Sequence, residues 1–406
     1  MEAEILVAGA GAAGLMAAFH ASGRGRQVIL AEKNQQPGLK ILISGGGRCN
    51  LTTTCRGSDL ELEYGPRCGR WLRHALRSFP PDALRSFVEE AGVPLQEESL
   101  GKIFPVSGRA RDVLDALVRV VGESGAKFLA DADVEELRVC DEGFRVRLSG
   151  QREVKVQHIV LATGGCSYPK TGTTGIGYRL CRELGHRIIE PRPHLAPLAV
   201  DLPWVQSFSG MTVEDAELSL RDGRGNILCR RRRPFLFTHR GLSGPAAMDL
   251  AGFVEEAEGS CELSIDLAPD MTEEEIDRSL QEAARAGHRR TAQRCLPLWI
   301  PERLRYELAR QADAGVAISD LTRDARRRLV AGVKSTRLMV DRSLGFAHAE
   351  VTRGGVCLDE IDPRTMESKI VPGLFVCGEL LDVDGPIGGF NFQAAFATGR
   401  LAGLSA

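Results

Sequence analysis

The sequence has few aromatic residues and no apolar run long enough to cross a bilayer. Aromatic side chains make up 5% of its 406 residues, and every apolar stretch is interrupted before the roughly 20 residues that a transmembrane helix needs. The N-terminus lacks the basic and then apolar segment of a secretory signal. We therefore expect a cytoplasmic protein with no membrane contact.

The eleven cysteines include no C-x-x-C pair, and their odd number excludes a full disulfide framework. Their spacing suits neither zinc nor an iron–sulfur cluster, so no metal site is predicted. Most of the thiols are expected to be small buried groups. Cys49 and Cys166 lie in glycine-rich segments that are candidates for cofactor contact, and their roles stay open.

The chain also lacks an excess of charge of one sign, since its net charge is −2. No global field therefore attracts nucleic acid. Arginines cluster at 230–233, 289–290 and 326–328, but these clusters lack interleaved aromatic residues and a recognisable RNA-binding module. They are interpreted as solvated faces, and a nucleic-acid partner is not expected.

The start of the chain carries a glycine pattern between an apolar run and a small-residue helix. Gly9 permits a tight turn, Gly11 lets the backbone approach a pyrophosphate, and Gly14 allows close packing of helix on strand. The helix N-terminus supplies N–H groups for the anion. Glu32 closes the next apolar run, VILAE, at about the distance expected for the acid that binds a ribose. Together they predict FAD or NAD rather than NADP.

Two later segments are expected to line the same ligand. The stretch 39–53, LKILISGGGRCNLTT, lacks periodicity and predicts a loop, in which Arg48 can fork onto phosphate and Asn50 is both donor and acceptor. GGFNFQAAFATG at 388–399 predicts a helix whose N-terminus favours negative charge on a reduced flavin. A closing helix docked through small residues is the structural alternative, and both interpretations can hold.

Three side chains are candidates for acid–base catalysis. Tyr168 and Lys170 lie in the loop GGCSYPKTGTTG, where tyrosine can protonate a developing carbanion and lysine can orient an anion. His239 lies in FLFTHRGLSGP. Each also has a structural interpretation, as a turn tyrosine, a solvated lysine and a packed histidine, so the catalytic residue stays open.

The order of the apolar, alternating and helix-periodic segments along the chain predicts a discontinuous α/β protein. Residues 1–190 and 335–406 are expected to form a dinucleotide-binding domain from both termini. Short alternating runs predict an inserted β-rich domain over 191–270, and charged periodic segments predict a helical subdomain over 271–334.

Six segments together resemble the YhiN/BaiN flavoprotein family of aminoacetone-oxidase-like, NAD(P)/FAD-dependent oxidoreductases. They are LKILISGGGRCNLT, GKIFPVSGRARDV, LATGGCSYPKTGTTG, FLFTHRGLSGP, GGVCLDEIDPRTMESKIVPGLF and CGELLDVDGPIGGFN. The resemblance extends essentially end to end and implies a Rossmann-like FAD domain with a barrel-like β insert and a helical subdomain. Two positions depart from the family pattern: Ile176 stands where aspartate is usual, and RRP precedes Phe235 where Gly-Glu is usual.

The glycine pattern and the resemblance together give one set of expected cofactor-binding residues. They are Gly9, Gly11, Ala12, Ala13, Gly14, Glu32, Lys33, Lys40, Gly46, Gly47, Arg48, Asn50, Val134, Thr163, Gly164, Gly378, Glu379, Asp382, Gly389, Phe390 and Asn391.

The resemblance implies an FAD-dependent oxidoreductase that exchanges hydride with a small or hydrophobic organic substrate. No second G-x-G-x-x-G unit follows a strand, so NAD(P)H is expected only as a transient electron donor to a reductase. The alternatives are an amine or aminoketone oxidase that uses oxygen, an RNA-associated flavoprotein and a flavin redox sensor. The substrate and the oligomeric state stay open.

Overall fold

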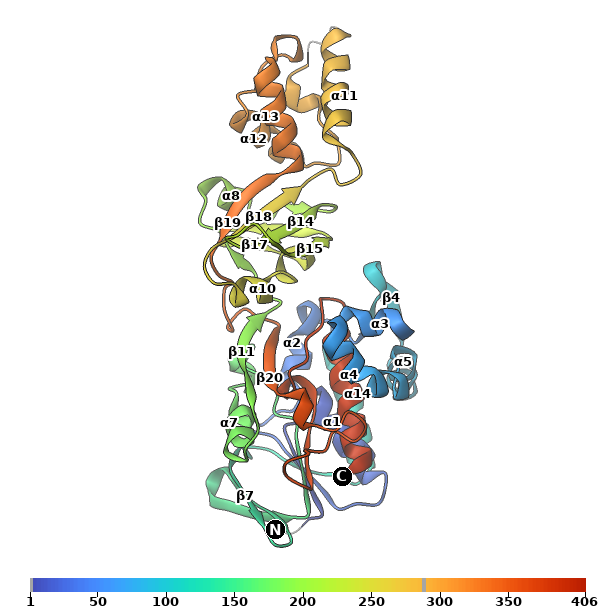
Figure 1. Ribbon diagram of the computed structural model, residues 1–406. Coiled ribbons are helices and arrows are strands. Elements are labelled where there is room, and N and C mark those ends of the chain that lie inside the picture. The colour runs from blue at the N-terminus through green and yellow to red at the C-terminus, as the bar shows by residue number, and fades with distance from the viewer. Residues whose placement is uncertain (1–2, 287–289) are drawn as a thin grey trace. The chain divides into compact units, whose positions relative to one another are not determined.

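The computed structural model describes residues 3–286 and 290–406, and the chain divides into two compact units (Figure 1). One unit joins Met1–Pro193 to Phe346–Ala406, and the other is His194–Gly345. The second unit thus begins three residues after the expected start of the inserted domain at 191. It ends beyond 334, because a strand at 336–340 pairs within it.

The first unit is built on a five-stranded parallel sheet. Its strands, in order across the sheet, are β21 (Leu374–Val376), β10 (His158–Leu161), β1 (Ile5–Ala8), β2 (Val28–Ala31) and β6 (Lys127–Leu129). Every residue of β1 and β2 is buried, as is typical of a parallel sheet covered on both faces. This arrangement confirms the Rossmann-type α/β class expected from the sequence.

The same unit holds helices and three smaller sheets. The helices are α1 (Ala12–Ser22), α2 (Leu39–Gly47), α3 (Gly57–Glu63), α4 (Gly65–Ser78), α5 (Pro81–Glu90), α6 (Ala110–Glu123), α7 (Ile176–Glu183) and α14 (Phe390–Ser405). The smaller sheets pair β3 (Thr52–Thr53), β5 (Lys102–Pro105) and β4 (Leu95–Glu98), then β7 (Val134–Cys140), β8 (Gly143–Leu148) and β9 (Arg152–Val156), then β11 (Ile188–His194) and β20 (Val351–Val356).

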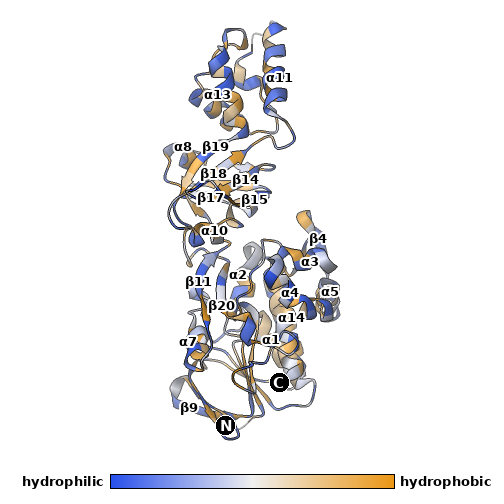
Figure 2. Ribbon diagram, in the orientation of Figure 1, coloured by the Kyte–Doolittle hydropathy of each residue, from blue (hydrophilic) through white to orange (hydrophobic). Residues whose placement is uncertain are grey.

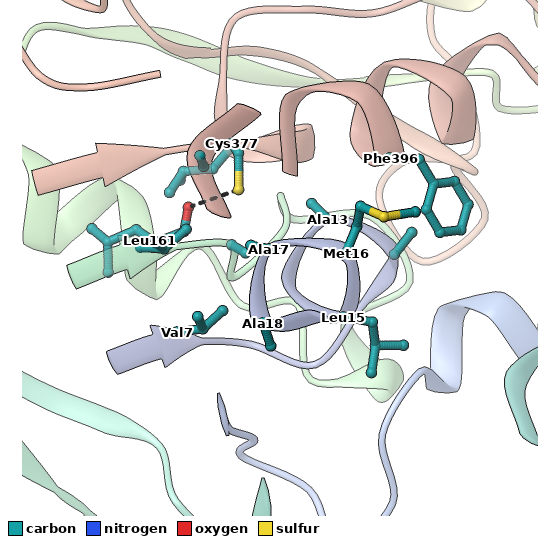
Figure 3. Close-up of a cluster of buried hydrophobic side chains, with 14 of the residues drawn as sticks. Val7, Ala13, Leu15, Met16, Ala17, Ala18, Leu161, Cys377 and Phe396 are labelled. Atoms are coloured by element: carbon teal, nitrogen blue, oxygen red, sulfur yellow. Dashed lines mark hydrogen bonds between the residues drawn. The ribbon is translucent and has the colours of Figure 1, made fainter. Parts of the chain in front are cut away.

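Helices α1 and α14, from opposite ends of the chain, lie side by side and run parallel. A Cβ on Gly399 would lie 2.2 Å from the carbonyl oxygen of Ala13, and one on Gly403 would lie 2.2 Å from that of Ala17. Only glycine fits at both contacts, because backbone cannot move aside. Figure 3 shows the apolar cluster around α1, in which Met16 points toward Phe396 of α14. Both chain ends therefore contribute to one core.

The second unit contains two antiparallel sheets, with helices before, between and after their strands. One sheet orders β12 (Leu198–Ala199), β17 (Gly241–Ser243), β16 (Phe235–Thr238) and β13 (Thr212–Val213), and the other orders β15 (Ile227–Arg232), β14 (Glu217–Arg221), β18 (Cys261–Asp266) and β19 (Thr336–Val340). Its helices are α8 (Pro203–Ser207), α9 (Pro245–Met248), α10 (Ala251–Glu256), α11 (Glu273–Arg285), α12 (Glu302–Gln311) and α13 (Arg323–Lys334). Hydrophilic residues run along α11 and α13 in Figure 2. Within residues 3–286 and 290–406, none of the helices has the length and apolarity that crossing a bilayer requires.

Candidate functional site

The turn between β1 and α1 uses its three glycines in three ways. Gly9 has φ +99°, and a Cβ on it would lie 2.5 Å from Ala162 O, while a Cβ on Gly14 would lie 1.8 Å from Gly9 O. Packing therefore requires both. Gly11 differs, because no atom of the described chain lies within 4 Å of the position a Cβ would take. The described chain leaves space there, at the residue that precedes α1.

Glu32, immediately after β2, closes one side of this turn. It is 8% exposed, and its carboxylate accepts hydrogen bonds from Ala10 N (2.8 Å), Asn34 N (3.0 Å) and Asn34 Nδ2 (2.8 Å). A carboxylate has about four acceptor positions. One acceptor position therefore remains for a hydroxyl donor such as a ribose.

Thr163 follows β10 at the carboxyl edge of the parallel sheet, where ligands of open α/β sheets bind. Its Oγ1 is buried and has no hydrogen-bond partner in the described part of the chain. Gly164 takes the left-handed conformation, with φ +73°. A buried hydroxyl without a partner is costly, so this atom fits a site that a bound group completes.

The N-terminus of α14 forms a second open helix end. Its first residue follows Gly389, which has φ +89° and whose Cβ would lie 2.3 Å from Thr52 O. The Asn50 side chain links Thr52 to Gly389, because its amide donates to Thr52 O (3.2 Å) and accepts from Gly389 N (3.0 Å). Asn391 steadies the preceding loop through a pair of hydrogen bonds with Gly385, at 2.9 and 2.8 Å.

The two helix ends point the same way. Because Ala13 is level with Gly399 and the helices run parallel, the start of α14 lies about 12 Å beyond the start of α1 along the axis. Both ends favour negative charge. This offset suits an elongated ligand with an anionic group at one helix end and an electron-rich ring at the other, as in FAD.

A polar cluster joins three further segments of the first unit. Lys40 Nζ, on α2, lies 2.5 Å from Glu379 Oε2 and 2.5 Å from Ser167 Oγ, and Ser167 Oγ donates to Glu379 Oε1 at 2.7 Å. Thr352 of β20 donates its N–H to Glu379 Oε1 at 2.9 Å and accepts from Ser167 N at 3.1 Å. The side chains of Lys40 and Glu379 are 21% and 19% exposed, which leaves this ion pair little solvent screening.

Other expected cofactor residues of the glycine-rich segment lie on the surface. The prediction of a loop is wrong for Leu39 to Ile43, which form the helical part of α2, and for Thr52–Thr53, which pair with β5 as strand β3. From Ser44 the backbone leaves the helix. Gly46 and Gly47 are exposed. Arg48 bonds Glu98 at 2.9 and 3.0 Å, and its guanidinium lies 4.1 Å from the centre of the Phe104 ring.

The remaining members of the expected set lie around these elements. Lys33 Nζ lies 3.4 Å from Asp133 Oδ2, and Val134 begins β7 as a buried residue. Gly378 donates its N–H to Thr398 Oγ1 of α14 at 3.0 Å, and Asp382 pairs with Arg67 at 3.8 Å. Three more stand in the first turns of α1 and α14, namely Ala12, Ala13 and Phe390.

The three catalytic candidates have different surroundings. Tyr168 has φ +51° and is half-buried; burial, and secondarily the Glu350 carboxylate, raise the pKa of its phenol. Lys170 is exposed, two residues along the same loop. His239 is exposed at the turn between β16 and β17 of the second unit.

Ser167, Thr352 and Tyr178 are the polar residues that sequence reasoning missed. Ser167 lies between two candidate residues, Cys166 and Tyr168, and its position in the sequence was the signal that could have identified it. Tyr178, on α7, donates its hydroxyl to Glu379 O at 3.2 Å. Thr352 stands in a strand with no motif around it, and only the tertiary structure brings it to Glu379.

The cysteines flanking this region are not activated thiols. All eleven are free, burial raises the pKa of Cys49 to about 12, and burial, followed by the Glu379 charge, raises the pKa of Cys166. A thiolate is the reactive form, so neither acts as a nucleophile at neutral pH. Among residues 3–286 and 290–406, no group of three potential metal-ligating side chains comes together.

Several arginines of the clusters in the second unit form ion pairs. Arg232 bonds Asp215 and Asp270 at 2.6 Å, and Arg233 bonds Asp249 at 3.1 Å. Arg326 and Arg328 pair with Asp277 and Asp313. Arg289 lies outside the described residues. The RRP departure thus contributes intramolecular ion pairs, and Ile176 packs, partly buried, against the core of the first unit.

A family model described as "HI0933-like protein Rossmann domain" matches residues 3–405. The "Ribosomal RNA dihydrouridine synthase" of Escherichia coli K12 is 30% identical over 396 residues, which cover 97% of this chain and 96% of that protein. The "3-dehydro-bile acid delta(4,6)-reductase" of Clostridium scindens is 30% identical over 407 residues, 98% of each chain.

Among solved structures, the 3-ketosteroid-delta4-(5alpha)-dehydrogenase from Rhodococcus jostii RHA1, in complex with 4-androstene-3,17-dione, has a TM-score of 0.51. The likeness covers 100% of this chain and 96% of that one at 16% identity. At this identity it shows a shared fold.

Proposed function

Since the chain belongs to the HI0933-like family of flavoprotein oxidoreductases, we propose that it is an FAD-dependent reductase of a carbon–carbon double bond conjugated to a carbonyl group. Membership confirms the resemblance drawn from the motifs and the assignment as a flavoprotein oxidoreductase. The reaction, the electron donor and the residues in the site are the parts proposed here.

The reaction follows from what the two relatives' names share. Dihydrouridine is uridine with its ring double bond saturated, and that bond is conjugated to a carbonyl. The bile-acid relative is named as a reductase of a 3-dehydro substrate at positions 4 and 6. In the reaction proposed for this chain, a hydride would add to the carbon remote from the carbonyl and a proton to the carbon beside it.

The observation that carries the cofactor assignment is the pair of open helix ends with a partnerless hydroxyl beside them. The space over Gly11 and the N–H groups of α1 would hold the pyrophosphate, and the remaining acceptor position of Glu32 would hold the adenosine ribose. The start of α14 would face the flavin, and Thr163, whose backbone lies against the Gly9 turn, would border the cofactor. When bound, FAD supplies the hydride; NAD(P)H is the proposed donor that reduces it.

Tyr168 is the proposed source of the proton. Its phenol is half-buried, and its raised pKa keeps it protonated at neutral pH, as a general acid requires. Its left-handed backbone is unusual for a bulky residue, and such strain collects at functional sites. Lys170 is exposed and would orient the substrate at most.

Anaerobic stopped-flow absorbance tests the proposal. The FAD-loaded protein is mixed first with NADH or NADPH and then with a panel of conjugated enone steroids. We expect flavin bleaching followed by reoxidation by an enone. In Tyr168→Phe, bleaching should stay within about twofold of wild type, while reoxidation should slow by about 100-fold, within the usual range for losing a general acid.

The controls distinguish the alternatives. No bleaching by either nicotinamide, with bleaching by an aminoketone and fast reoxidation by oxygen, would identify an oxidase and overturn the proposal. Bleaching without reoxidation by any unsaturated substrate would leave a flavin sensor. The wild-type reoxidation rate should fall as the pH rises through the raised pKa of Tyr168, and this fall should be absent in Tyr168→Phe.

A uracil ring within RNA is the second candidate substrate, favoured by the end-to-end match to the E. coli relative. The ion-paired arginines of the second unit favour the small-molecule alternative. Incubation of the reduced protein with transcribed ribosomal RNA, followed by nucleoside mass spectrometry, separates the two. Dihydrouridine without any enone turnover would select RNA.

A further inference from the structure

Ser167 lies at the centre of the polar cluster and has no exposed surface. Its hydroxyl accepts from Lys40 Nζ and donates to Glu379 Oε1, at 2.5 and 2.7 Å. Lys40 and Glu379 also bond each other directly at 2.5 Å. The ion pair therefore stays compensated without the serine, and what the serine adds is a link from the pair to its own loop.

That loop holds Tyr168 in a conformation it would not adopt unaided. Tyr168 has φ +51°, its N–H donates to Phe346 O at 3.0 Å, and its carbonyl accepts from Thr171 Oγ1 at 2.8 Å. Thr173 Oγ1 donates to the Ser167 carbonyl at 2.5 Å. The bonds from Thr171 and Thr173 shape the loop internally. Asn34 Nδ2 also donates to the Thr171 carbonyl at 3.1 Å, and Lys33 Nζ lies 3.4 Å from Thr174 Oγ1, but none of these bonds reaches the Lys40–Glu379 pair.

Ser167 bonds the loop directly to the Lys40–Glu379 pair. Its side chain bonds α2 through Lys40 and the segment after β21 through Glu379, and its N–H bonds Thr352 of β20 at 3.1 Å. We propose that Ser167 is a positioning residue: its hydroxyl ties the Tyr168 loop to the Lys40–Glu379 pair and so fixes where the phenol stands. This inference rests on the proposed role of Tyr168 as proton donor.

A shape-matched pair of variants tests it in the full-length, FAD-loaded protein. Ser167→Thr keeps the hydroxyl, and Ser167→Val has the same shape without it. We expect Ser167→Val to slow reoxidation by an enone by about 10- to 100-fold relative to Ser167→Thr, since a small displacement of a catalytic group has effects of this size. Flavin reduction by NAD(P)H and the Kd for FAD should differ by less than about twofold.

Hydrogen exchange provides a readout that does not depend on turnover. Amides 166–173 should exchange faster in Ser167→Val than in Ser167→Thr. Equal exchange and equal reoxidation in the two variants would overturn the proposal, and so would a weakened FAD affinity as the main effect, because Ser167 would then act on the cofactor. If the wild type reduces no conjugated double bond, the proposed function fails, and the exchange comparison still decides whether Ser167 holds the loop.

Two further variants complete the experiment. Ser167→Ala addresses overpacking: if neither β-branched variant folds, it replaces them and is compared with wild type. Ser124→Ala is the control for loss of a serine hydroxyl elsewhere in the chain, because Ser124 Oγ donates to Val121 O at 2.7 Å at the end of α6. It should leave loop exchange and both half-reactions unchanged.

Discussion

Helices α1 and α14 of the first unit begin differently from helices α11 and α13 of the second. The first two start after Gly11 and Gly389, which have no side chain to cap the helix, although the Asn50 amide accepts from Gly389 N at 3.0 Å. The second two start after Thr272 and Thr322, whose hydroxyls accept from Glu275 N and Ala325 N. Threonine satisfies one of the free N–H groups at the start of α11 and of α13, whereas the glycine before α1 or α14 has no side chain that could do so.

The two pairs of helices are also stabilised differently. Helix α11 is exposed and charged outside a narrow apolar face, with Ile276 and Leu280 buried, so its cap matters to its stability. Helix α14 is buried along most of its length and gains its stability from packing against α1 rather than from a cap. Burial thus compensates for ends that are left open.

The largest expected effect comes from breaking the packing of α14 on α1. In Gly399→Ala, the new Cβ would lie 2.2 Å from the backbone oxygen of Ala13, so the helices must separate. We expect a loss of about 3 kcal/mol in the free energy of unfolding, at the upper end for overpacking, together with loss of bound FAD. Urea denaturation and flavin content measure both.

Gly122→Ala on α6 is the matched control. Gly122 is also helical, but no atom of the described residues lies within 4 Å of the new Cβ. Alanine has the higher helix propensity, so this variant should gain up to about 1 kcal/mol. Equal losses in the two variants would contradict the glycine-mediated packing of α1 and α14.

A smaller and more selective effect is expected at the open helix end. Gly11 has φ −81°, which alanine accepts, and nothing in the described chain meets its Cβ. Gly11→Ala should therefore leave the unfolding free energy of the apoprotein within about 0.5 kcal/mol and weaken FAD binding by about 10- to 100-fold, equivalent to about 1.4 to 2.7 kcal/mol. Flavin fluorescence titration measures the Kd.

Gly315→Ala controls for the loss of an unhindered glycine, because Gly315 in the second unit has no described atom within 4 Å of its Cβ position either. Its Kd for FAD should equal that of wild type. An unchanged Kd in Gly11→Ala would mean that the space over α1 does not receive the cofactor, and the FAD assignment at this turn would be wrong.

The contrast between these glycines shows how far sequence reasoning reaches. The spacing of Gly9, Gly11 and Gly14 predicted the strand, the turn and the helix because each glycine acts on its immediate neighbours in the chain. Glu32 followed for the same reason, as the end of the next strand. Features that depend on contacts between residues close in the chain can therefore be predicted from the sequence.

The polar cluster was only partly predictable, because it depends on long-range contacts. Lys40 and Glu379 came from the family resemblance, but Ser167 and Thr352 reach them from segments more than 100 residues from Lys40. Neither has a spacing that indicates a partner. The helical part of α2 was missed because the glycines after it made the whole segment look irregular, although Leu39 to Ile43 complete a helical turn.

The smallest effect should come from the capped helices, where the comparison predicts stability without function. Thr272 forms a capping box: its hydroxyl accepts from Glu275 N at 3.2 Å, and Glu275 Oε2 accepts from Thr272 N at 2.8 Å. Thr272→Ala should lower the free energy of unfolding by about 1 kcal/mol and leave the Kd for FAD unchanged, whereas Thr272→Ser should keep the cap. Denaturation curves with flavin titration measure both quantities. A weaker affinity for FAD in Thr272→Ala would show that α11 is coupled to the cofactor site, and the distinction between capped helices of the fold and open helices of the site would then fail.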